Sequence, residues 1–241
     1  MVTDVTLTGA VLAPLLRSDA VGPRITYYDD ATGERIELSA VTLANWAAKT
    51  ANLLRDELGA GPGTRVAVLL PAHWQTAAVF FGVWWIGAEV VLGSESGSAE
   101  VALCTADRLD DADRAVGMGE IAVLSLDPFG KPVADLPVGL TDYATAVRVH
   151  GDQVVPEAVP GPALEGRSVT EILSLARDRA TALGLVADRV WSAGSWDSRD
   201  LLVDNLLSVF VAGGSLVQVS HPDFSAQERR RTIEKVTRIF E

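Results

Sequence analysis

The sequence predicts an α/β fold in which helices flank a mostly parallel sheet, with a short β-hairpin near the N-terminus. Short apolar runs typical of strands alternate with segments of helical periodicity along most of the 241 residues. One of these runs, residues 65–70, is almost continuously apolar, as expected for a strand that is covered on both faces. Repeated strand–helix–strand units join parallel strands through right-handed crossovers.

The first part of the chain predicts a helix, a hairpin and a second helix. Residues 7–17 have the pattern of a short amphipathic helix. Strand-like runs at 25–28 and 35–38 flank a polar loop that contains glycine, which indicates a β-hairpin. Ser39 is placed to cap a helix that extends to about Leu58. The next expected elements are a strand, a helix and a strand, at 65–70, 73–86 and 88–92.

The middle of the chain interrupts this alternation. Strand-like runs at 101–106 and 121–126 flank a polar segment that we expect to be helical. Residues 127–166 contain six prolines and many glycines, which predicts an irregular surface segment with an edge hairpin near 148–155. Regular alternation then resumes, with helices expected at 168–183, 198–212 and 225–240 and strands at 189–192 and 215–219.

The composition is that of a folded protein without a general affinity for nucleic acid. Hydrophobic residues make up 48% of the chain, and the formal net charge is −12, whereas binding to a phosphate backbone requires clustered Lys and Arg. The best membrane-spanning candidate, residues 76–92, is at the short limit and contains Glu89. Cys104 lies in an apolar run and is expected to be a buried structural thiol. We therefore expect one cytoplasmic α/β domain over residues 1–241, with no membrane and no nucleic-acid partner.

Several segments carry a family resemblance. Residues 59–71 read GAGPGTRVAVLLP and residues 85–92 read WIGAEVVL, while residues 188–192 read DRVWS and residues 211–217 read VAGGSLV. The order and spacing of these segments, together with the preceding hairpin, resemble the adenylate-forming (AMP-binding) enzymes, which include acyl-CoA synthetases, luciferases and adenylation domains of peptide synthetases. This resemblance implies the fold of the first subdomain of such an enzyme.

The chain departs from that family where ATP would bind. The family holds the phosphates in a Ser/Thr/Gly-rich loop that ends in Lys-Gly, because backbone N–H groups and hydroxyls there face the anion. The matching residues 155–167 contain no Ser or Thr, and their three prolines lack N–H groups. Glu157 and Glu165 would repel a triphosphate, and in one register Glu165 stands where the family has Lys. The family's later motifs for adenine and metal fall beyond Glu241. The resemblance thus implies a truncated, degenerate relative without adenylation chemistry, for which we expect no catalytic residue, metal or cofactor.

Two functional hypotheses follow. The first is a non-catalytic domain that acts through self-association or a protein partner, because half of a two-lobed fold would expose a surface that needs covering. The alternative is a small-ligand-binding protein or an acyl- or nucleotide-related enzyme with a remodelled pocket after the strand at 189–192. A Ser195–His221–Asp197 triad also fits on paper, but the many Ser and Asp residues make it weakly supported. The pocket candidates are Ser192, Ser195, Trp196 and Asp197.

Overall fold

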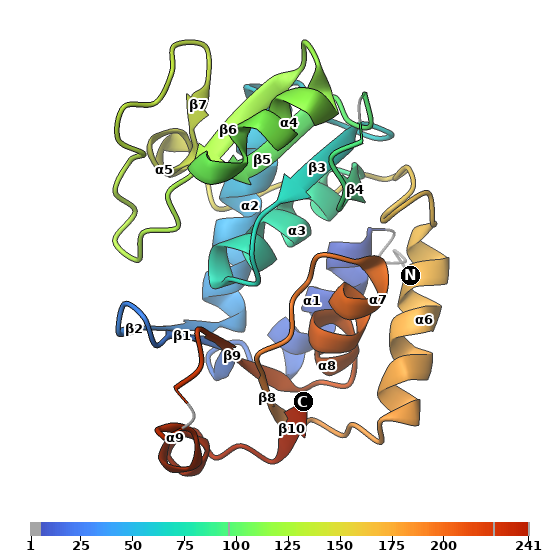
Figure 1. The fold of residues 1–241 in the computed structure, drawn as a ribbon. Helices are drawn as coiled ribbons and strands as arrows, with labels where there is room; N and C mark the ends of the chain where they lie inside the picture. Colours follow the sequence, from blue (N-terminus) through green and yellow to red (C-terminus); the bar gives the residue numbers. More distant parts are fainter. Residues whose placement is uncertain (1–5, 96, 224, 241) are drawn as a thin grey trace.

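The protein consists of two five-stranded sheets with helices between and outside them (Figure 1). The structure is a computed structural model that describes residues 6–95, 97–223 and 225–240. Sheet A has the order β10-β8-β9-β1-β2. Its strands run parallel except β2, which forms the predicted N-terminal hairpin with β1. Its strands are β1 (Pro23–Asp29), β2 (Glu34–Ser39), β8 (Arg189–Ser192), β9 (Ser215–Ser220) and β10 (Arg238–Phe240).

Sheet B is parallel throughout and has the order β4-β3-β5-β6-β7. Along β3, Val66 and Val68 point into the hydrophobic core between the sheets, whereas Ala67 and Leu69 point to the outer face beneath α4. This alternation follows from the two-residue period of a strand and explains the continuous apolar run. The strands of sheet B are β3 (Arg65–Leu69), β4 (Glu89–Val91), β5 (Val101–Thr105), β6 (Glu120–Leu124) and β7 (Thr141–Asp142).

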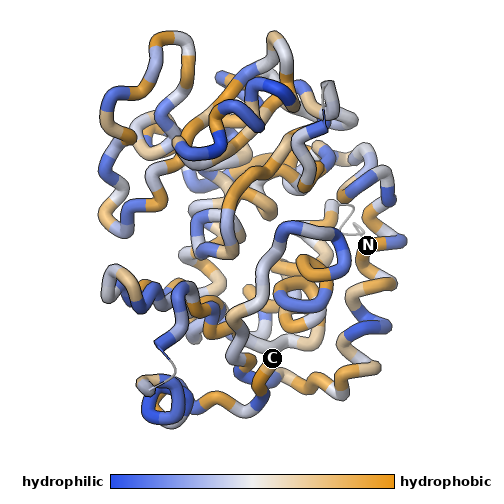
Figure 2. Tube along the Cα trace, in the orientation of Figure 1, coloured by the Kyte–Doolittle hydropathy of each residue, from blue (hydrophilic) through white to orange (hydrophobic). Residues whose placement is uncertain are grey.

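Helices separate the two sheets and cover their outer faces. In Figure 1, α2 and α3 lie between the sheets, α4 covers sheet B and α9 lies beyond sheet A. In Figure 2, most residues of α9 are coloured as hydrophilic. No helix within the described residues is long and apolar enough to cross a bilayer. The helices are α1 (Leu7–Ser18), α2 (Ala40–Asp56), α3 (Trp74–Trp85), α4 (Leu109–Val116), α5 (Tyr143–Ala146), α6 (Val169–Ala182), α7 (Arg199–Leu202), α8 (Ser208–Val211) and α9 (Gln227–Ile233), with short turns η1 (Ala106–Arg108), η2 (Val147–Val149) and η3 (Val203–Leu207).

The structure corrects three expectations about the elements. The strands form two sheets rather than one. The edge hairpin near 148–155 is absent: β7 lies at Thr141–Asp142, and Val147–Val149 form a 3-10 turn. The expected helix at 225–240 ends at Ile233, because Lys235 adopts a positive φ and the chain then pairs with β8 as β10.

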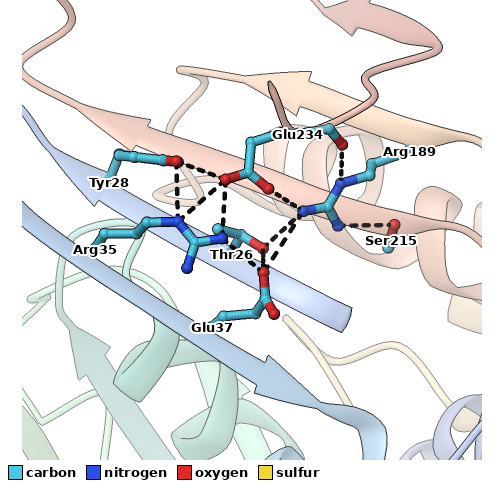
Figure 3. Close-up of polar contacts among 7 residues, drawn as sticks. All are labelled: Thr26, Tyr28, Arg35, Glu37, Arg189, Ser215 and Glu234. Carbon is cyan, nitrogen blue, oxygen red and sulfur yellow. Dashed lines mark hydrogen bonds and ion pairs between the residues drawn. The ribbon is translucent and has the colours of Figure 1, made fainter. Parts of the chain in front are cut away.

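A buried carboxylate attaches this last helix to sheet A. The Glu234 side chain is 4% exposed and accepts hydrogen bonds from Tyr28 Oη (2.5 Å), Arg35 Nη2 (2.9 Å) and Arg189 Nη2 (2.5 Å), as Figure 3 shows. Burial alone would raise the pKa of Glu234, but the hydrogen bonds from Tyr28, Arg189 and Arg35 outweigh it and lower the pKa. The carboxylate therefore remains ionised and connects the helix end to three strands, β1, β2 and β8.

We expect Glu234→Ala to destabilise the protein by about 3–5 kcal/mol, because it removes the buried carboxylate that pairs with both Arg35 and Arg189. Urea unfolding measures this loss of free energy. Glu228→Ala, at an exposed position on the same helix, is the matched control and should change the unfolding free energy by less than about 0.5 kcal/mol. Equal losses in the two variants would contradict the proposed attachment.

Candidate functional site

A cleft lies where strands of both sheets end. One part has a volume of about 580 Å³ and is lined by residues that follow β3, β5, β8 and β9. A second part of about 840 Å³ adjoins it and shares Pro71, Ser220 and His221. In open α/β sheets, ligands bind beyond the carboxyl ends of the strands. The cleft is therefore the candidate binding site of this fold.

The structure brings three of the four predicted pocket residues to this cleft. Ser195, Trp196 and Asp197 line its smaller part. Ser192 does not line it: its side chain is fully buried, and its Oγ accepts a hydrogen bond from the N–H of Gly194 at 3.0 Å. The segment after β8 thus forms the pocket wall, while Ser192 holds the turn that shapes it.

The Ser195–His221–Asp197 arrangement lacks the connections of a hydrolytic triad. The hydroxyl of Ser195 donates to Asp197 Oδ1 at 2.9 Å. His221 instead pairs through Nδ1 with Asp29 Oδ1 at 2.9 Å. A triad needs the imidazole to bond the hydroxyl and the carboxylate to orient that same imidazole. The three side chains share a cleft, but His221 bonds neither Ser195 nor Asp197.

Two side chains in the cleft wall have polar atoms without a partner. Trp196 and Gln218 are each 1% exposed, and neither Nε1 of Trp196 nor Oε1 of Gln218 makes a hydrogen bond among the described residues. Gln218 is otherwise fixed, since its Nε2 donates to the Gly194 carbonyl at 3.1 Å. Buried polar groups are usually paired, so this donor and this acceptor each lack a partner that an ordered water or a ligand would supply.

The larger part of the cleft contains a histidine that the sequence placed only as a first-turn helix residue. His73 is instead the N-cap of α3, and its Nδ1 accepts a hydrogen bond from the N–H of Gln75 at 3.1 Å. The proton of the neutral ring therefore lies on Nε2, which is 3.7 Å from Glu34 Oε1. Burial lowers the pKa of His73, and nearby Glu34 only partly opposes this. The His73–Glu34 pair links the hairpin to α3. No spacing in the sequence predicts that these two residues lie close together.

The loop at 155–167 lies along the open edge of sheet B. Leu164 forms a parallel bridge with Val90 of β4, whose N–H donates to the Ala163 carbonyl at 2.9 Å. The N–H of Glu165 returns a bond to the Val90 carbonyl at 3.1 Å. This pairing protects an edge strand that would otherwise present unpaired backbone groups.

Every residue from Glu157 to Arg167 that has an amide hydrogen donates it to the protein itself. Glu157 donates to the Trp85 carbonyl at 3.2 Å and Gly161 to the Gly87 carbonyl at 2.9 Å. The prolines among these residues have no amide hydrogen. The remaining donors bond carbonyls or carboxylates within the loop and its neighbours: Ala158, Val159, Ala163, Leu164, Glu165, Gly166 and Arg167.

Carboxylates occupy the positions around this loop that an anion would need. Oε1 of Glu157 accepts from the next two amides at 2.9 and 3.0 Å. Glu165 Oε1 accepts from the N–H of Leu92 at 2.7 Å, and buried Glu89 accepts from the N–H of Gly166 at 2.5 Å. Each carboxylate thus occupies amide hydrogens that an external anion would need, and its negative charge repels such an anion.

The cation at the end of the loop is also paired. Arg167 Nη1 lies 3.1 Å from Glu171 Oε1, four residues further along. Glu171 forms a capping box with Ser168 at the start of α6. The backbone N–H and side chain of Ser168, together with Arg167, lower the pKa of Glu171 to about 2. The charge of Arg167 is therefore balanced by the Glu171 carboxylate, which caps α6.

Comparison with known proteins places the chain among adenylate-forming folds. Residues 18–108 match the AMP-binding enzyme family. A Mycobacterium tuberculosis protein described as a TIGR03089 family protein is 66% identical over 245 residues, which cover both chains completely.

Solved structures of CoA ligases share this fold at low sequence identity. An acyl-CoA synthetase of Brucella canis is 18% identical with a TM-score of 0.77, over 98% of this chain and 47% of its own. A benzoate CoA ligase of Burkholderia xenovorans is 16% identical with a TM-score of 0.72, over 97% of this chain and 49% of its own. The chain thus spans about half the length of these ligases.

The buried histidine in the cleft predicts a pH dependence of stability. Because burial lowers the pKa of His73, the unfolded chain takes up this proton first as the pH falls through the ordinary histidine pKa of about 6.5. The unfolded state then binds more protons than the folded state, so stability should fall from pH 7 to pH 5. His73→Asn keeps an acceptor for the N-cap and should make this decrease shallower. Urea unfolding at several pH values checks it, and an unchanged slope in the variant would contradict the assignment.

Proposed function

Because the chain belongs to the TIGR03089 family and has the N-terminal fold of the adenylate-forming enzymes, we propose that it is a binding protein that has lost adenylation. The observation that carries the proposal is the complete use of amide hydrogens from Glu157 to Arg167 within the protein. A phosphate loop stabilises its anion through backbone N–H groups that are free to point at it. To bind a triphosphate here, the loop would have to leave the edge of β4.

Electrostatics supports the same proposal. The loop region contributes Glu89, Glu157 and Glu165, each of which already accepts a backbone hydrogen bond. Bringing phosphate charges to such carboxylates is unfavourable, and Arg167, the cation at the end of the loop, is paired with Glu171. A loop that no longer binds a triphosphate leaves the cleft between the sheets as a site for other ligands.

We expect no exchange of labelled pyrophosphate into ATP with a panel of carboxylic acids, because no donors remain to hold the phosphates. An active CoA ligase assayed in parallel provides the positive control. Protein-dependent exchange above background with any acid would refute the proposal. Thermal unfolding with and without Mg-ATP offers an independent readout, and a saturable rise in Tm would count against it as well.

A second candidate is small-ligand binding at the wall formed by Ser195, Trp196 and Asp197. It is supported by the unpartnered Nε1 of Trp196 and Oε1 of Gln218, which suit a ligand that both accepts and donates hydrogen bonds. A thermal-shift screen of acids, nucleotides and CoA thioesters identifies such a ligand. A shift that persists in Trp196→Phe, which lacks the indole N–H, would argue against this wall as the site.

Self-association or a protein partner is proposed for the irregular segment 127–166. Four of its valines are at least 76% exposed, which is unusual for residues of this type in one segment. They are Val138, Val149, Val155 and Val159. Sedimentation equilibrium decides between a monomer and a dimer, and Val155→Ser with Val159→Ser should weaken any dimer formed through this segment.

A further inference from the structure

A small pocket lined by aromatic residues lies apart from the loop at 155–167. Its volume is about 160 Å³, and Trp46, Trp74, Phe129 and Tyr143 contribute to its wall. The indole rings of Trp46 and Trp74 are 5.7 Å apart at an angle of 66°, an edge-to-face arrangement. An apolar protein cavity of about 150 Å³ stays dry and binds benzene. The pocket, which Gln75, Asp127 and Arg148 also line, has a similar volume, so one six-membered aromatic ring fits against its aromatic wall.

One wall of the pocket is a turn that hydrogen bonds hold open. The Asp127 carbonyl accepts from Gln75 Nε2 at 3.1 Å, and the Asp127 carboxylate accepts from the N–H groups of Phe129 and Lys131 at 2.8 and 3.2 Å. Arg148 Nη2 donates to the carbonyls of Phe129 and Gly130 at 2.9 and 2.5 Å. These bonds fix the backbone of the turn from both sides, so it does not collapse into the space.

A glycine is favoured in this turn. Gly130 has a φ of +67°, and a Cβ built there would lie 2.3 Å from Arg148 Nη2. Most other residues would strain the backbone and push aside the guanidinium that holds the wall. The geometry of the wall is thus a specific property of this sequence.

The floor of the pocket is fixed by the core. The Tyr143 hydroxyl lies 2.7 Å from Thr50 Oγ1 on α2, and Tyr143 is 2% exposed. Ala144 and Val147 complete the floor with small side chains and are also buried. An unfilled space next to a rigid core normally costs stability unless neighbouring groups relax into it. Here the floor and the turn are both held, so the space persists.

Phe129 lies at the rim of this pocket with its side chain largely in water. It is 82% exposed, although it belongs to the wall of the small pocket and also to the wall of the larger cleft. The segment Asp127–Phe129 is common to both hollows. An exposed phenylalanine next to an aromatic pocket gains buried apolar area when a flat ring binds beneath it.

We propose that this pocket, formed by Trp46, Trp74, Phe129, Tyr143 and Ala144, binds a monocyclic aromatic ring as a ligand or as part of one. No residue of the 155–167 loop or of the wall at 193–197 belongs to this site. The proposal is therefore independent of the proposed loss of adenylation.

Phenol is the probe, with cyclohexanol as a non-aromatic compound of matched size. We expect phenol to bind with a dissociation constant on the order of 1 mM, as suits seven heavy atoms, and at least ~3-fold more tightly than cyclohexanol. Two-dimensional NMR of the indole N–H groups follows binding. Phenol should shift the signals of Trp46 and Trp74 and give intermolecular NOEs to their rings.

Ala144→Leu fills the pocket and should weaken phenol binding by at least ~10-fold. Thr145→Leu, at the exposed next position on α5, is the matched control and should bind phenol as the wild type does. If Ala144→Leu does not fold, the intermolecular NOEs in the wild-type protein decide alone. Absence of any phenol-induced shift, equal binding by Ala144→Leu and wild type, or NOEs that place Phe129 itself against Trp46 and Trp74 without bound phenol would each overturn the proposal.

Discussion

One constraint determines what the 155–167 loop can bind: each backbone N–H group donates one strong hydrogen bond. Between Glu157 and Arg167, these bonds attach the chain to the edge of β4 and to its own carboxylates. The interaction that completes sheet B therefore also removes the donors that a phosphate loop needs. Close contacts reinforce it, because a Cβ at Gly161 would lie 2.6 Å from the backbone nitrogen of Gly63. In this region, the hydrogen bonds that hold the loop in place are the same bonds that leave it without donors for a phosphate.

The two ends of the chain share sheet A, and this arrangement is held by charge. β1 lies next to β9, and the carboxylate of Glu234 lies between arginines of β2 and β8. Burial of such groups is favourable only when each has a partner, which is the case for all three. Segments far along the chain thus complete one edge of each sheet: residues 155–167 lie along β4, and strand β10 pairs with β8. The cleft and the aromatic pocket lie on the framework that these attachments fix.

Much of the fold was predictable from local pattern, whereas contacts between distant segments were not. The apolar runs of β3 and β5, the Ser39 cap and the hairpin follow from periodicity and turn chemistry. The prolines of the 155–167 loop predicted missing donors, but not that the remaining amides bond the loop itself and neighbouring residues, with Glu165 and Gly166 bonding β4. Residues 238–240 were predicted as the end of the helix at 225–240, and only pairing with β8 makes them a strand. Likewise, Ser195, Trp196 and Asp197 were identified from their place after a strand, while His73 and Glu34 meet only through the tertiary fold.

Amide hydrogen exchange of the loop tests the central claim most directly. If the N–H groups of Gly161, Ala163, Glu165 and Gly166 are bonded within the protein, they should exchange at least ~100-fold more slowly than in an unstructured peptide. Their rates should also be unchanged by millimolar Mg-ATP. Rapid exchange of these amides, or new protection on adding Mg-ATP, would show that the loop is free to bind a nucleotide and would contradict the account.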